Sequence, residues 1–274
     1  MDINKKYSQW IEWFQLILVS FFSALFAWYL IRFLTDLTTL YFSYDLNIHA
    51  IMNLSGVHFL SPVNSSQWTR DAIVTIYLSG PFMNLVLGLG FFITYTFVPR
   101  KTQSFSFFML WVMIFSFTLM FATFVENSLQ HTGVYRVSQL MHISGAFLVV
   151  SAVVALYFLY LTGLSIGKLM MLSLPPRHTS EGRMKTSYFL SAFVIPWALV
   201  FAFCFMETNL SIRIIYLLGS LILLPFIWMR GSETKGVHLK ALPPLMWMDT
   251  VSIILFLIGV LILRQIIASG IVLK

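Results

Sequence analysis

Long apolar runs separated by short polar stretches dominate this chain of 274 residues. A helix rises 1.5 Å per residue, so about 20 apolar residues cover the hydrocarbon core of a bilayer. The runs that are long enough cover residues 11–34, 73–98, 104–125, 139–165, 187–207, 212–229 and 246–268. The pattern therefore predicts an all-α polytopic membrane protein with about seven transmembrane helices, forming a single domain over residues 1–274.

A different period appears between the first two runs. From Leu40 to Leu54 every even position is apolar, while most odd positions are polar. Because successive side chains of a strand point to opposite faces, a period of two predicts β-structure with one apolar face. Ser55-Gly56 then turns the chain into a second short strand, residues 57–60. We expect a β-ribbon over residues 40–60, packed against the second span because a strand edge at membrane depth must be covered by protein.

The second span carries small and polar residues on one face. Gly80, Asn84 and Gly88 recur at intervals of four, and Pro81 has no N–H to donate to the carbonyl of Tyr77. Small residues let helices approach closely in a membrane, and an amide within a span is retained when it has a hydrogen-bond partner. We expect the other spans to pack around this helix.

Composition and charge narrow the class of protein. Only 10% of the residues are charged, against about a quarter in soluble domains. The net charge of +7 does not indicate nucleic-acid binding, because the basic residues fall in short loops between the predicted spans, where they orient a membrane protein. Of the 17 Lys and Arg residues, 11 lie on the side of the membrane that holds the N-terminus. This bias predicts a cytoplasmic N-terminus and a C-terminus on the opposite side, in the cell (inner) membrane. Cys204 is the single cysteine, which excludes an internal disulfide. Arg264, near the outer end of the last span, is expected to extend to the interface.

Histidines gather on the predicted non-cytoplasmic side. They are His49, His58, His131 and His142, and Glu126 lies on the same side. Imidazole and carboxylate are ligands for zinc or iron. No two of these histidines are three or four residues apart, however, which is the spacing that puts two ligands on one helix face. Two interpretations stay open: interfacial or hydrogen-bonded histidines without a metal, and a zinc or iron site.

The order of these parts resembles the site-2 proteases, the M50 family of intramembrane zinc metallopeptidases. In that family a span ending in HExxH is followed by a β-ribbon and by a span that opens with a GPxxN-type motif. Gly80, Pro81 and Asn84 match this motif, and Asn127 stands where a later region supplies an asparagine. The resemblance covers residues 20–165 and implies a groove that would hold a membrane segment or lipid where a protease holds its substrate.

The groups that hold zinc in that family have no counterpart at the matching positions. Where HExxH would fall, near the end of the first span, the chain reads Ala27-Trp28-Tyr29-Leu30-Ile31, and no histidine is followed by glutamate. The third zinc ligand is an aspartate of the later region, yet no aspartate occurs between Asp71 and Asp249.

These observations support three hypotheses on function. The first is a pseudoenzyme with a degenerate site-2-protease-like core and no cofactor, which binds a membrane segment or a lipid as a scaffold or partner subunit. The second is a metal-dependent membrane enzyme that uses the histidine-rich face. The third is a transporter subunit, indicated by Pro81, Pro196 and Pro225 within spans.

Overall fold

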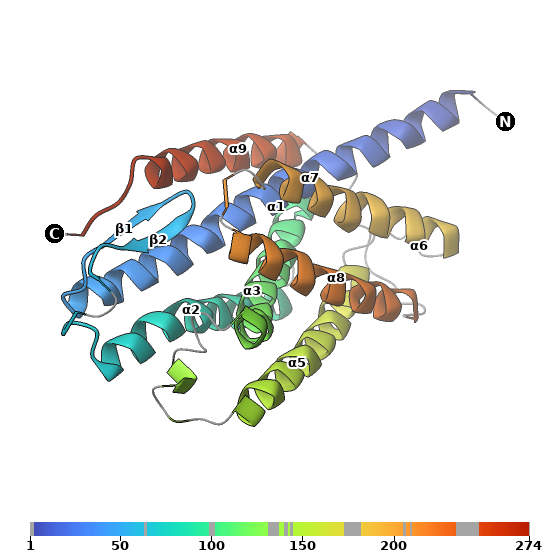
Figure 1. Ribbon diagram of the computed structural model, residues 1–274. Coiled ribbons are helices and arrows are strands. Elements are labelled where there is room, and N and C mark those ends of the chain that lie inside the picture. The colour runs from blue at the N-terminus through green and yellow to red at the C-terminus, as the bar shows by residue number, and fades with distance from the viewer. Residues whose placement is uncertain are drawn as a thin grey trace.

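The computed structural model of the chain is a bundle of long helices with a small sheet at one end, and the two termini lie at opposite ends of the bundle (Figure 1). It describes residues 3–62, 65–98, 102–130, 137–139, 142, 145–172, 182–204, 207–208, 210–233 and 247–273. Within these residues, seven helices are long and apolar enough to cross a membrane. The prediction of a helical multi-pass membrane protein with a short β-ribbon between its first two spans is confirmed.

The observed elements differ from the predicted ranges mainly at their ends. The fourth span begins at residue 145 instead of 139, and the fifth is continuous through a turn of π-helix. In chain order the elements are α1 (Ile3–Asp45), β1 (Ala50–Asn53), β2 (Gly56–Phe59), α2 (Arg70–Phe97), α3 (Gln103–Gln130), α5 (Gly145–Leu172), α6 (Gly182–Phe189), η2 (Leu190–Val194), α7 (Ile195–Cys204), α8 (Leu210–Glu233) and α9 (Trp247–Ala268).

The first helix continues through residue 45, so the expected ribbon over residues 40–60 is wrong in its first part. The helix ends where Asn47 adopts a left-handed conformation, with φ of 58°. The N–H of Ile48 donates to the carbonyl of Ser43 at 2.8 Å, and the N–H of Asn47 donates to that of Tyr44 at 3.0 Å. These two bonds form a Schellman motif, which satisfies the last carbonyls of the helix. Ile48 is buried in a small cluster with Ala72 and Ile76 of α2, against which Phe42 also packs.

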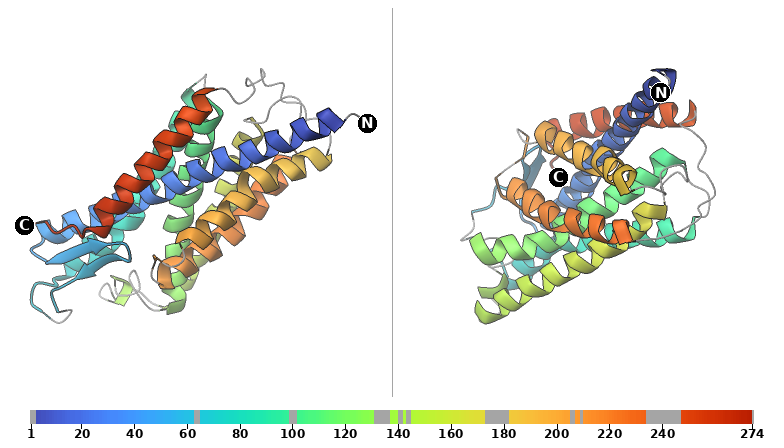
Figure 2. Two further views of the ribbon diagram at one scale, coloured as in Figure 1. Left: turned by 90° about the horizontal axis from the view of Figure 1, so that it is seen from above. Right: turned by 90° about the vertical axis from the view of Figure 1, so that its right-hand side faces the viewer.

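The remaining ribbon is a short antiparallel hairpin. Ala50 pairs with Phe59 and Asn53 with Gly56, so a two-residue turn joins the strands. Gly56 has φ of 122°, a conformation that favours glycine. The hairpin lies mainly on α1 and α9, not on α2 as expected, although Phe59 contacts the ring of Tyr77 in α2. Figure 2 shows the sheet over the C-terminal end of α1.

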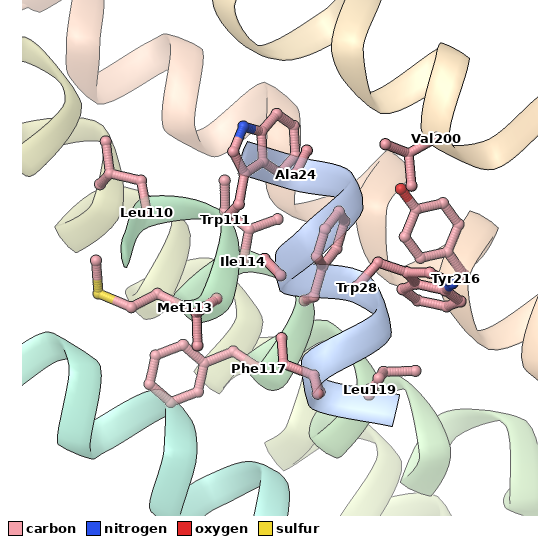
Figure 3. Close-up of a cluster of buried hydrophobic side chains, with 14 of the residues drawn as sticks. Ala24, Trp28, Leu110, Trp111, Met113, Ile114, Phe117, Leu119, Val200 and Tyr216 are labelled. Carbon is pink, nitrogen blue, oxygen red and sulfur yellow. The ribbon is translucent and has the colours of Figure 1, made fainter. Parts of the chain in front are cut away.

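Helix α3, not α2, occupies the centre of the bundle. It contacts α1, α2, α5, α8 and α9, and 78% of its most apolar stretch is buried, against 33% for α2. The expectation that the spans pack around residues 73–98 is therefore wrong: α2 lies at the edge and buries one face. Figure 3 shows the core that α3 forms with α1, α7 and α8, in which Trp28 meets Phe115 and Tyr216 edge to face.

Candidate functional site

The polar residues of α2 meet a row of threonines on α1. The Thr35 hydroxyl donates a hydrogen bond of 2.8 Å to Oδ1 of Asn84. One turn along, the hydroxyls of Thr39 and Ser79 share a hydrogen bond of 3.2 Å. A Cβ at Gly80 would lie 3.2 Å from the Thr35 methyl carbon, so the absence of a side chain there lets the two helices approach closely. On the α2 side of this α1–α2 junction the residues are buried, and on the α1 side the two threonines are partly buried.

Local sequence positions α2 for these contacts. Thr69 caps the helix, accepting a hydrogen bond of 3.2 Å from the N–H of Ala72. The helix continues past Pro81 without a break. Gly88 faces α3, where an added Cβ would lie 2.8 Å from the Phe117 ring. The face that carries Gly80, Asn84 and Gly88 is therefore filled by α1 and α3 of the same chain.

The residues of α1 that face this motif are not the ones expected from the sequence. Ala27, Trp28, Tyr29 and Ile31 are all buried in the hydrophobic core. The residues opposite Asn84 and its neighbours lie two turns further on, in the stretch Thr35-Asp36-Leu37-Thr38-Thr39. The junction thus presents hydroxyls and an amide. These groups do not fit the thiolate, imidazole and carboxylate ligand sets in which zinc is bound.

Charged residues lie on another face of the same helix. Arg32 and Asp36 form an ion pair at 3.4 Å, with side chains only 8% and 16% exposed. Charged side chains within a membrane span pair with each other because few other polar partners are present, and such pairs often mark functional sites.

A second charged contact corrects an expectation. Arg264 does not extend alone to the interface: its Nε donates a hydrogen bond of 2.8 Å to Glu207, which also accepts one of 2.5 Å from the Tyr29 hydroxyl. This network joins α1, the segment after α7, and α9. Neither the run of apolar residues around Tyr29 nor the isolated Glu207 gave a signal that could have predicted it.

The histidines of the metal hypothesis lie on exposed parts of the structure. His49 and His142 are exposed. His58 is also exposed, and its Nε2 forms a hydrogen bond of 2.6 Å with the Ser55 hydroxyl. Within the described residues no three His, Cys, Asp or Glu side chains come together as metal ligands would.

The positions of three further predicted site side chains lie outside the described part of the structure. His131 lies outside the described residues. Glu126 and Asn127 belong to the last turns of α3, and their side chains lie outside the description. The zinc or iron site on this face therefore stays a prediction.

A crevice of about 500 Å³ opens between α2, α3 and α5. This volume falls in the range of about 300–1,000 Å³ typical of ligand pockets. Leu85 and Phe92 of α2, Phe117 of α3, and Leu161 and Ser165 of α5 are among the residues that line it. Phe117 also packs on Gly88, so the crevice adjoins the filled face of α2.

Sequence reasoning missed this crevice, because apolar stripes on a span look the same whether they face lipid or a pocket. The hydroxyls of Thr162 and Ser165 in its wall donate to carbonyls of their own helix, as they would on a lipid-facing surface. The chain matches no protein-family model, no curated protein and no solved structure with which it was compared.

Proposed function

We propose that this multi-pass membrane protein has a degenerate site-2-protease-like core that does not hydrolyse peptides and instead binds a hydrophobic ligand, a membrane segment or a lipid, beside α2. It acts as a scaffold or partner subunit. Its N-terminus is cytoplasmic and its C-terminus lies on the far side of the cell (inner) membrane, as the distribution of Lys and Arg favours.

The observation that carries the proposal is the hydrogen bond between Thr35 and Asn84. In an HExxH helix the two histidines, four residues apart, hold zinc and the glutamate acts as the base. Thr35, Asp36 and Thr39 have this same spacing, on the helix that meets the GPxxN-like motif. Two hydroxyls thus have the spacing of the two histidines of HExxH, and they bond to α2 directly.

The crevice supports the binding part of the proposal. Side chains fill the junction between α1 and α2. Phe117 of α3, by contrast, faces Gly88 of α2 and also lines the apolar crevice of about 500 Å³. Its walls come from α2 and α3, which lie within the region of resemblance, and from α5, which begins within it.

Catalysis is tested with purified protein, zinc and a transmembrane substrate, with an active intramembrane zinc protease as the positive control. We expect no cleavage by this protein. Cleavage that a chelator abolishes would refute the proposal.

Binding is tested with single-cysteine variants, because replacing Cys204 with serine leaves the chain free of cysteine. An environment-sensitive fluorophore is placed on Leu161→Cys in the crevice and, as a matched control, on Val150→Cys, which is exposed elsewhere on α5. Titration in detergent with a transmembrane peptide or a phospholipid should give a saturable signal at residue 161 only. Equal, non-saturable signals at both positions would contradict binding in the crevice.

A further inference from the structure

The crevice has a direction across the membrane. Its lining on α5 consists of Phe158, Leu161, Thr162, Ser165 and Ile166. The Phe158 end is apolar, and the two hydroxyls lie toward the other end. Both hydroxyls donate to carbonyls of α5 itself. This end of α5 lies on the same side of the membrane as the N-terminus, the cytoplasmic side in the proposed orientation.

Lys168 extends this row of lining residues. It lies three residues after Ser165 and seven after Leu161, positions that share one face of a helix, and its side chain is exposed. From Phe158 to Lys168 the helix rises about 15 Å. This is half of the roughly 30 Å hydrocarbon thickness, the depth of one leaflet.

The dimensions favour a lipid chain over a protein segment. A transmembrane helix about 10 Å wide and 30 Å long occupies roughly 2,000 Å³, several times the volume of about 500 Å³ that the crevice offers. An acyl chain is narrow and apolar, and it reaches across one leaflet. A phospholipid whose chain enters at the level of Lys168 would place its phosphate beside the ammonium group.

We propose that the crevice between α2, α3 and α5 binds one acyl chain of an anionic phospholipid of the cytoplasmic leaflet, with Lys168 contacting the headgroup. This inference rests on the proposed function and names the ligand of that same site. Phe92, Phe117 and Leu161 contact the chain, and Ser165 lies below the headgroup.

The test is native mass spectrometry of the full-length protein with an equal mixture of phosphatidylglycerol and phosphatidylcholine that carry identical chains. A basic residue at a membrane surface is worth about 1 kcal/mol toward anionic lipid, which corresponds to about a fivefold preference. Wild type should therefore retain phosphatidylglycerol about fivefold over phosphatidylcholine. Lys168→Gln should reduce this ratio to about one while phosphatidylcholine still binds.

Two further variants separate the crevice from the rest of the surface. Ser165→Phe adds a ring inside the crevice and should reduce retention of both lipids. Arg70→Gln removes an exposed charge at the opposite end of α2 and should leave the ratio unchanged.

The possible failures are distinguishable. Equal retention of the two lipids by wild type, or an unchanged preference in Lys168→Gln, would overturn the anionic-lipid inference but leave a hydrophobic ligand in place. Capture of a polypeptide by a photoreactive residue at Leu161 would likewise replace the lipid by a membrane segment. Unchanged retention in Ser165→Phe, together with no saturable signal from the fluorophore at residue 161, would overturn the proposed function as well.

Discussion

The hydroxyl of Thr35 and the amide oxygen of Asn84 are joined by a hydrogen bond of 2.8 Å that links the first two transmembrane helices. Asn84 is only 3% exposed, so water does not compete for this bond. The lipid around the bundle offers no alternative partner. The bond therefore fixes the rotation of α2 about its own axis, and with it the side of α2 that is left to form the crevice.

Removing either partner of this bond should destabilise the protein. Polar contacts between transmembrane helices are worth about 0.6 kcal/mol on average and up to about 1.7 kcal/mol. We expect Thr35→Val and Asn84→Leu each to lower the unfolding free energy, with a coupling energy in this range in a double-mutant cycle. Unfolding in mixed detergent micelles, followed by circular dichroism, provides the measurement.

A matched control comes from the exposed end of α2. The Thr94 hydroxyl bonds only to the carbonyl of Gly90 in its own helix, so Thr94→Val should have little effect. Additive effects of Thr35→Val and Asn84→Leu would mean that the two side chains stabilise the fold independently of each other, contrary to this account.

The number of spans followed from hydropathy, but their arrangement did not. In water a helix that is apolar all round must be buried, whereas in a membrane a helix of the same composition is stable against lipid. Hydropathy could therefore not distinguish α3 at the centre from α9 at the edge, where 78% and 11% of the most apolar stretch are buried. The small and polar face of α2 was recognised, since Gly80 and Asn84 differ from their neighbours in size and polarity.

The end of the first helix was misread for a related reason. Alternation of apolar and polar residues around Tyr44 is consistent with a strand, but Asn47 has a short polar side chain that tolerates the left-handed conformation and so ends the helix. The threonines at the junction were not recognised either. A threonine that bonds only to its own helix and one that bonds to a neighbour look the same in sequence.

The contact between α5 and α8 should be sensitive to a single methyl group. A Cβ added at Gly167 would lie 2.5 Å from the carbonyl oxygen of Ile227, so the helices would have to separate. Overpacking of this kind costs about 1–3 kcal/mol. We expect Gly167→Ala to lower the thermal unfolding midpoint measured in detergent.

Gly90→Ala is the comparison for this variant, because a Cβ at Gly90 would meet nothing within 4 Å. Alanine favours helix over glycine by up to about 1 kcal/mol, so this change should be neutral or stabilising. Equal unfolding midpoints for the two variants would show that the α5–α8 contact is not tight.

The stability that the network around Glu207 provides should come more from Tyr29 than from Arg264. Tyr29 is 2% exposed, and Tyr29→Phe removes a buried hydrogen bond to the carboxylate, worth about 1.5–3 kcal/mol for a charged partner. The Arg264 side chain is 46% exposed, and exposed ion pairs contribute about 0–1 kcal/mol. Arg264→Gln should therefore destabilise the protein less than Tyr29→Phe in denaturant unfolding. The reverse order would place the stabilisation in the ion pair.

The C-terminal segment should hold the hairpin in place. Ile271 and Met52 exchange two backbone hydrogen bonds, each of 3.0 Å, so the chain after α9 forms a single antiparallel β-bridge with β1. Ile271→Pro removes the N–H that donates to the Met52 carbonyl. We expect the N–H of Met52 to exchange with deuterium faster in this variant, because the segment after α9 is then held beside it by one backbone bond instead of two. Ile271→Ala keeps the backbone donor and controls for loss of the side chain.

Since β2 lies on the other side of β1, exchange at the hairpin bonds between β1 and β2 should change less than at Met52. Uniform acceleration across the hairpin would instead indicate that the C-terminal segment stabilises the sheet as a whole.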